Sequence, residues 1–386
     1  MKISREHSPS MTDGQEIAHA CSAGRSDEYS SKYPSGRLAE LSPAMPKAHS
    51  AHHITTAALG ALVLVILPII VFVGSIATGL YPIDPCSVCQ IIFDGITGQH
   101  SFPDTMAANM VWQVRLPRAC AAALAGIGLS LAGAVFQGIF KNPLASPYTL
   151  GVSNGAGFGA GIAILFALGA IGTQVLSVGF GLIAVGITFA IAARRKSSTV
   201  TLVLAGMLVG SLFASLVALL KFVADPTEKL PQIVYWLMGS LSSITYDELA
   251  MILPLYIVSL IVLFLFRWRT NVLSLGDREA RSFGIDVRRD RAIVISAASV
   301  LTALVVSISG IIGWVGIVVP HLARMIVGPD YRKLLPAAAS LGACYLMVID
   351  DLCRTLTASE IPIGVITGII GVPMFLYFIY KGKINW

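Results

Sequence analysis

The sequence predicts an all-α membrane protein, a polytopic bundle of about ten transmembrane helices. Of its 386 residues, 55% are hydrophobic and only 12% are charged, whereas a soluble domain has roughly 25% charged residues. Long runs without any charge recur along the chain, and about 20 apolar residues suffice to cross a bilayer as a helix. The net charge of +6 does not indicate a nucleic-acid partner, because the basic residues lie at the ends of apolar runs.

The first part of the chain, residues 1–51, differs from the rest. It is rich in Ser, Glu, Lys and Arg, it has no apolar run, and its six basic residues balance its six acidic ones. This composition favours a disordered cytoplasmic tail. The apolar run that follows, from Ile54 to Leu80, exceeds the roughly 7–15 residues of a signal-peptide core. We therefore expect it to stay in the protein as the first spanning helix.

Ten apolar runs predict the helices of one transmembrane domain over residues 52–386. They lie near residues 54–80, 108–140, 148–169, 174–193, 199–224, 248–266, 289–309, 314–328, 333–356 and 361–380. The eighth run is short for a full crossing, so we expect a half-helix near residues 310–316 to accompany it. An even number of spans places both termini on one side of the membrane.

The basic residues predict which side that is. Most Lys and Arg after the tail fall in alternate loops and at the C-terminus, whereas Asp and Glu gather in the other loops. Cytoplasmic loops carry the excess of Lys and Arg, so both termini are expected in the cytoplasm. Five basic residues depart from this pattern at outer helix ends: Arg115, Arg118, Lys221, Lys229 and Arg354.

These exceptions indicate contact with an acidic partner outside the membrane, or with lipid headgroups, or an internal ion pair. Arg354 has Asp350 and Asp351 one helical turn earlier and can pair with them. Arg115 and Arg118 have no close acidic neighbour in the sequence, which favours an external partner for them.

Glycines and a turn mark the segment from Arg115 to Gly159. Gly151, Gly155 and Gly159 recur every four residues, which places them on one helix face where a neighbouring backbone can approach closely. The sequence Asn142-Pro143-Leu144 predicts a turn at the inner end of the second span. An Asn before Pro also suits the start of a helix, so Asn142 is a candidate cap for the third span.

The loop from Asn271 to Val287 predicts two small helices on the cytoplasmic surface. Its apolar residues Leu273, Ala280 and Phe283 recur on a helical period among charged ones, and glycines stand at 276 and 284. Such a pattern is typical of an amphipathic surface helix.

Several of these stretches resemble one protein family. RLPRACAAALAGIGLSLAGAVFQGIFKNPLASPYTLGVSNGAGFG (115–159), YWLMGSLSSIT (235–245), LSLGDREARSFGI (273–285), GWVGIVVPHLARMIVGPDYRKLLP (313–336) and EIPIGVITGIIGVP (360–373) resemble the FecCD-like membrane permeases of type II ABC importers, which take up iron-siderophores, haem and cobalamin. The resemblance extends from residue 54 to the end and leaves out the tail.

The resemblance implies a homodimeric permease in the inner (plasma) membrane, surrounded by membrane lipid, that opens alternately to the outside and to the cytoplasm. It also implies two partners, an ATP-binding subunit in two copies and an external substrate-binding protein. It implies that the binding protein docks at Arg115, Arg118 and Arg354. It implies that the ATP-binding subunit couples through Leu275, Gly276, Arg278, Arg281 and Gly284. The implied cytoplasmic gate consists of Asn142, Leu144 and Thr199. The cargo stays open among ferric siderophores, haem, cobalamin and an oxyanion, with iron chelates the commonest case.

Other functions are less well supported by the residues. The chain lacks the G-x-x-x-x-G-K-[ST] phosphate loop, so it is not expected to be an enzyme, and no cofactor is expected. The main alternative is a carrier driven by protons or sodium, with Asp350 or Asp351 as the ion site. Residues 151–155 match G-x-S-x-G around Ser153, but a hydrolase would need a strand before that turn.

The remaining cysteines and histidines predict no metal site. Cys86 and Cys89 supply only two of the four ligands of a structural zinc, and they are expected to be either a small disulfide or two free thiols. His321 is expected to hydrogen-bond a neighbouring helix.

Overall fold

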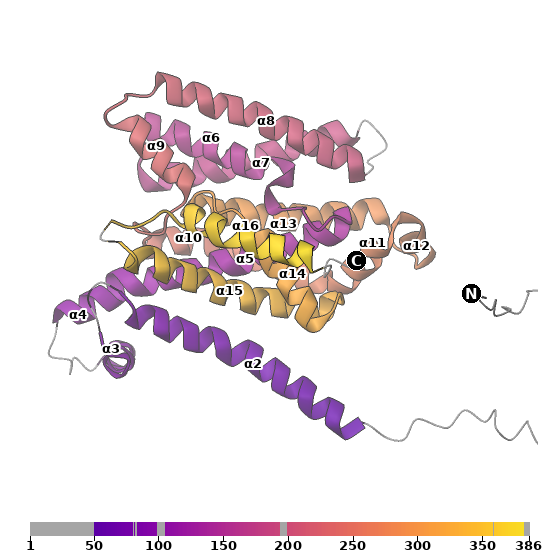
Figure 1. The fold of residues 1–386 in the computed structure, drawn as a ribbon. Helices are drawn as coiled ribbons and strands as arrows, with labels where there is room; N and C mark the ends of the chain where they lie inside the picture. The colour runs from indigo at the N-terminus through magenta and orange to yellow at the C-terminus, as the bar shows by residue number, and fades with distance from the viewer. Residues whose placement is uncertain are drawn as a thin grey trace, which may run out of the picture. The chain divides into compact units, whose positions relative to one another are not determined.

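The computed structural model describes residues 50–79, 81, 83–98, 105–193, 199–357 and 359–381. The predicted tail, residues 1–51, lies almost wholly outside them. Residues 60–386 group into one unit. All regular structure in the described part of the chain is helical (Figure 1), which confirms the predicted all-α membrane bundle. The helices are α2 (Ser50–Ala77), α3 (Pro85–Thr97), α4 (Thr105–Met110), η1 (Val111–Arg115), α5 (Leu116–Phe140), η2 (Pro147–Leu150), α6 (Val152–Leu165), α7 (Gly169–Ala193), α8 (Thr199–Val223), α9 (Lys229–Met238), α10 (Tyr246–Leu265), α11 (Arg267–Leu275), α12 (Asp277–Ser282), α13 (Val287–Ser309), α14 (Val315–Val327), α15 (Tyr331–Thr355) and α16 (Ile363–Tyr380).

Seven of the described helices are long and apolar enough to cross a membrane. They are the continuous helix Met106–Phe140, which joins α4, η1 and α5, together with α7, α8, α10, α13, α15 and α16. Three shorter apolar helices, Leu62–Ala77, Val152–Leu165 and Val315–Val327, lie where the first, third and eighth spans were expected. Every predicted run is therefore helical, while the count of ten crossings stays a prediction.

The helix α5 lies at the centre of the bundle, in contact with α13, α14 and α15. Small residues make this packing possible. A side chain at Gly126 would collide with the backbone of Gly342 in α15, and one at Gly133 with the backbone of Gly316 in α14. Because lipid is as apolar as the side chains, close van der Waals contact between backbones is a main source of helix association in a membrane.

The helices α6, α7 and α8 lie side by side next to this centre (Figure 1). Gly155 and Gly159 face the backbone of α7 at Phe180 and Leu176, as expected for a glycine face. The expectation was wrong for Gly151, which precedes α6 and has a φ of 79°. Gly151 instead lies against the backbone of α8.

Two parts of the backbone were not foreseen. The helices α3 and α9 lie between the predicted spans, where no helix was expected.

Residues 310–314 are not helical, so the prediction of a half-helix near residues 310–316 is wrong. Gly310 and Trp314 have φ values of 66° and 67°. Other elements bond to this irregular stretch, since Tyr148 Oη donates to the Ile312 carbonyl (2.5 Å). Irregular backbone at membrane depth is tolerated where protein buries it and satisfies it.

Candidate functional site

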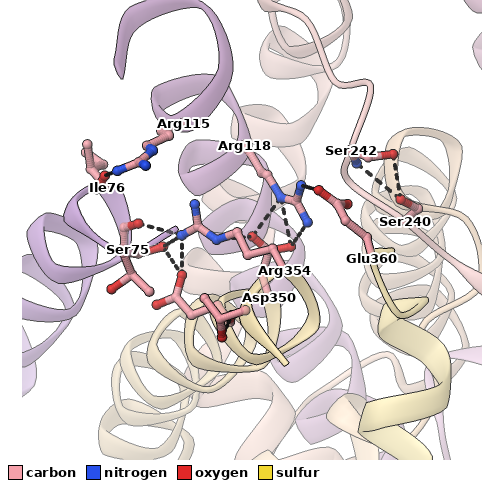
Figure 2. A network of polar contacts seen from close by, with 12 residues as sticks. Ser75, Ile76, Arg115, Arg118, Ser240, Ser242, Asp350, Arg354 and Glu360 are labelled. Atoms are coloured by element: carbon pink, nitrogen blue, oxygen red, sulfur yellow. Dashed lines mark hydrogen bonds and ion pairs between the residues drawn. The ribbon is translucent and has the colours of Figure 1, made fainter. Parts of the chain in front are cut away.

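A buried polar network joins one end of α5 to α15 (Figure 2). Arg118, in the first turn of α5, holds the carboxylate of Asp350 in α15 from two sides. Its Nε lies 2.9 Å from Oδ2, and its Nη2 lies 2.9 Å from Oδ1. Its Nη1 lies 2.6 Å from Oε1 of Glu360, just before α16. This geometry is the bidentate pairing that guanidinium and carboxylate favour.

Arg354 extends the network from α15 to α2. It pairs with Asp351, and its Nη2 donates to the carbonyl (2.5 Å) and the hydroxyl (3.0 Å) of Ser75. Ser75 Oγ in turn donates to Asp351 Oδ1 at 2.7 Å. The Arg354 Nε lies 3.8 Å from Asp350. Two arginines and three carboxylates therefore join α2, α5, α15 and the segment before α16.

Arg115 holds the end of α2 by a different means. Its Nη1 donates to the carbonyls of Ile76 and Ala77, each at 2.9 Å, and its Nη2 donates to the carbonyl of Tyr81. The last carbonyls of a helix have no hydrogen-bond donor within the helix. Here the Arg115 guanidinium is the donor for those of α2.

These contacts change the interpretation of the three arginines. Arg115, Arg118 and Arg354 are only 4%, 5% and 7% exposed, and their donors are directed at groups of the same chain. A docking protein would need accessible guanidinium groups, so the geometry does not support docking at these residues. Of the three interpretations offered for these arginines, the internal ion pair is the one that fits Arg118 and Arg354. For Arg118 this pairing could not be predicted, because Asp350 and Glu360 lie 232 and 242 residues away in the sequence.

The same network bears on the carrier alternative. An ion-coupling carboxylate in a membrane must bind and release its cation. Asp350 is fully buried and held by Arg118, with Arg354 nearby, and Asp351 is paired with Arg354. Both carboxylates thus already have fixed cationic partners.

The opposite end of α5 faces the two predicted surface helices, α11 and α12, which the structure confirms. Their inner side packs on a small apolar cluster of Val272, Leu273, Ala280, Ile285 and Val287. Gly276 and Gly284 form the turns with φ values of 139° and 75°. Arg278 and Arg281 are exposed, and so are Leu275 (56%) and Phe283 (60%). We call these four exposed side chains the α12 platform.

The α12 platform is attached firmly to the bundle. Lys141, at the end of α5, donates to the Leu275 carbonyl (2.5 Å). Asn271 in α11 donates to Asp330, which caps α15, at 2.6 Å. Phe283 was expected to share a helical period with Leu273 and Ala280, but it follows the end of α12 at Ser282 and is exposed, whereas the other two are buried.

The predicted gate residues belong to two elements, the turn after α5 and the start of α8. Asn142 Oδ1 accepts from the amide of Leu144 at 2.9 Å, so Asn142 caps its own turn. It does not cap the third span, because Ser146 begins η2 and Gly151 precedes α6. Leu144 is 58% exposed, and Thr199 is the first residue of α8. Among the described residues no hydrogen bond joins Thr199 to this turn, and the gate stays a prediction.

The side chains weighed for other chemistry give no catalytic or metal site. Ser153 lies inside α6, so the strand that a hydrolase needs is absent there. Both ring nitrogens of His321 lack a hydrogen-bond partner, contrary to expectation, and the ring packs between Phe375 and Phe378. Cys86 and Cys89 are free and exposed. Among the described residues no three His, Cys, Asp or Glu side chains form a metal-binding group.

Known proteins are similar to this chain in sequence and in fold. The model of the FecCD transport family matches residues 65–381. The molybdate import system permease protein MolB of Haemophilus influenzae is 38% identical, over 83% of this chain and 95% of its own. The cobalamin import system permease protein BtuC of Halobacterium salinarum is 40% identical over 74% of this chain and 77% of its own. The hemin transport system permease protein HmuU of Yersinia pestis is 36% identical over 71% and 84%.

A solved structure described as an inward-facing conformation of a metal-chelate type ABC transporter superposes with a TM-score of 0.75, at 36% identity, over 83% of this chain and 98% of that one. Because the family model and these relatives cover most of the chain, and the helical bundle agrees with them, the protein belongs to the FecCD transport family of ABC importer permease subunits.

Proposed function

We propose that this permease subunit passes an iron chelate (a siderophore complex or haem) or cobalamin from an external binding protein to the cytoplasm by alternating access. In this proposal two copies of the chain form the pathway in the inner membrane, and two ATP-binding subunits bind at the α12 platform. The N-terminus and C-terminus then face the cytoplasm, and the Arg118–Asp350 network lies at the outer end.

The α12 platform is the observation that carries the proposal. The chain has no phosphate-binding loop of its own, so energy from ATP must enter through contact with another protein. Exposed apolar side chains next to basic ones are typical of such a contact. Leu275 and Phe283 supply the apolar part, and Arg278 and Arg281 supply the charge. Movement of the platform would be transmitted to α13 through the short link 283–286 and to α5 through Lys141.

Two observations support the proposed cargo, the substrates in the names of the relatives and the residues that line one cavity. Relatives are named for cobalamin, hemin and molybdate import, so an oxyanion is the second candidate cargo. A cavity of about 270 Å³ between α9, α10 and α13 is lined by uncharged hydroxyl groups of Tyr235, Ser240, Ser242 and Ser243, beside Glu248. Such hydroxyl groups can donate hydrogen bonds to an oxyanion or to one part of an oxygen-rich chelate.

Reconstitution tests the proposal directly. The chain is placed in proteoliposomes with its ATP-binding subunit and its binding protein, and uptake of labelled ferric siderophore, haem, cobalamin and molybdate is compared. We expect one of the first three to enter only with ATP and both partners, and uptake to survive an uncoupler. Uptake that needs no partner and stops with the uncoupler would instead establish a gradient-driven carrier. Molybdate uptake alone would refute the proposed cargo but not the transport role.

A further inference from the structure

A cavity lies between the α12 platform and the ends of two spanning helices. It measures about 570 Å³, within the usual range of roughly 300–1,000 Å³ for small-ligand sites. One wall comes from the last turns of α7 and the start of α8, and contains Phe189, Ala192 and Leu202. The other wall comes from α12 and the start of α13. One side of the cavity is therefore apolar and the other is charged.

The charged wall holds three arginines, Arg281, Arg288 and Arg291, and two aspartates. Both aspartates are already engaged. Asp277 pairs with Arg291, and Asp286 caps α13 by accepting from the amides of Arg288 and Arg289, each at 3.1 Å. With three arginines against two aspartates, this wall of the cavity carries a net positive charge.

The arginines have unused donors. Arg281 and Arg288 form no salt bridge to any described residue. Arg291 is 7% exposed, yet its buried Nε has no hydrogen-bond partner. The described residues therefore offer these arginines fewer acceptors than the arginines have donors.

We propose that this cavity binds the headgroup of an anionic phospholipid, with the phosphate against Arg281 and Arg288 and the first acyl carbons against Phe189 and Leu202. Guanidinium groups pair with phosphate through two parallel hydrogen bonds. Basic pockets between spanning helices at a cytoplasmic surface attract anionic lipid, and this step rests on the proposed orientation. Because Arg281 belongs to α12, the lipid would also hold the platform against α7 and α13.

Native mass spectrometry of the purified full chain in detergent tests this inference. Phosphatidylglycerol and phosphatidylcholine are supplied at equal concentration. We expect at least a tenfold preference for phosphatidylglycerol, which is lost in the double variant Arg281→Gln/Arg288→Gln. The matched control is Arg278→Gln/Arg289→Gln, which removes the same charge from the same two helices at exposed residues that do not line the cavity. The control is expected to keep the preference.

Each other outcome overturns the proposal. Equal retention of the two lipids, or equal loss in both double variants, would show that no built site exists. Competition by inorganic phosphate at the concentration of the lipid would identify a soluble anion as the ligand. Displacement of the lipid when the ATP-binding subunit binds would assign the cavity to that protein. The measurement uses neither ATP nor cargo, so its failure is distinguishable from failure of the proposed transport.

Discussion

Arg118 and Asp350 form a bidentate ion pair between α5 and α15 in which the aspartate side chain is fully buried and the arginine side chain is 6% exposed. The pair stands at the same helix contact where Gly126 meets Gly342. Glycine packing brings the two backbones together along the helices, and the ion pair sets their relative position at one end. Buried ion pairs are well attested as determinants of register, more than of stability.

Breaking this pair from one side should therefore be costly. We expect Asp350→Asn to destabilise the protein by about 3–5 kcal/mol, since it leaves a buried guanidinium without its main anion. The double variant Arg118→Met/Asp350→Leu should be closer to wild type, because no charge is left buried. Thermal unfolding in detergent measures both, with the exposed Asp247→Asn as the control. Asp350→Asn as stable as Asp247→Asn would contradict the prediction.

The glycine contact between α6 and α7 offers a matched pair of substitutions. Gly159→Ala places a methyl group against the backbone of Leu176 and Ser177, whereas a methyl group at Gly179 in α7 meets no atom within 4 Å. We expect Gly159→Ala to cost about 1–3 kcal/mol through overpacking. Gly179→Ala should be neutral or slightly stabilising, since Ala favours a helix by up to about 1 kcal/mol over Gly. Equal melting temperatures for the two variants would show that α6 and α7 can move apart to accommodate the methyl group without loss of stability.

The sequence predicted the spanning helices well, because a helix that crosses lipid needs a long run of apolar residues and such runs are visible in the sequence. It could not identify the partners of Arg118, since Asp350 and Glu360 are remote in sequence and only the packing of α5 on α15 brings them together. Loop helices α3 and α9 were missed because they are short and amphipathic, and Gly151 was misplaced because four-residue spacing does not reveal where a helix begins. The surface helices α11 and α12 were predictable, but the outward direction of Phe283 depended on the helix end at Ser282.

The link between Asp330 and α11 predicts a pH dependence. Hydrogen bonds from the Arg332 amide and from Asn271 hold the pKa of Asp330 below its usual value of 3.8. A carboxylate with a lowered folded-state pKa stabilises the protein above its unfolded pKa, and the contribution is lost as the pH falls through the folded pKa. Asp330→Ala should cost about 1 kcal/mol at pH 7, as for loss of a helix cap. The difference in melting temperature between the wild type and Asp330→Ala should be smaller at pH 3 than at pH 7. A difference that does not change with pH would exclude the carboxylate charge as its cause.

The α12 platform predicts the effect of losing its exposed aromatic ring. Phe283→Ala should weaken binding of the ATP-binding subunit tenfold or more, because a buried aromatic anchor at an interface is worth about 2 kcal/mol. The control is Phe222→Ala, which removes a still more exposed ring (85%, against 60% for Phe283) from the far end of α8. Affinity is measured between purified subunits in detergent. If both variants bind as wild type does, the platform is not the contact surface.

The turn before η2 predicts a leak. Leu144 presents its side chain to the surface while its amide is fixed by Asn142, so truncation removes apolar volume without altering the turn. In the proposed dimer, Leu144→Ala would leave a gap at the closed gate that neighbours fill only partly. Proteoliposomes loaded with calcein should then lose the dye faster without ATP. The control, Leu168→Ala, truncates a similarly exposed leucine just beyond the opposite end of α6 and should leak as wild type does. Equal, slow efflux from both variants would show that the turn only connects two helices, and that the gate must be sought along other parts of the pathway.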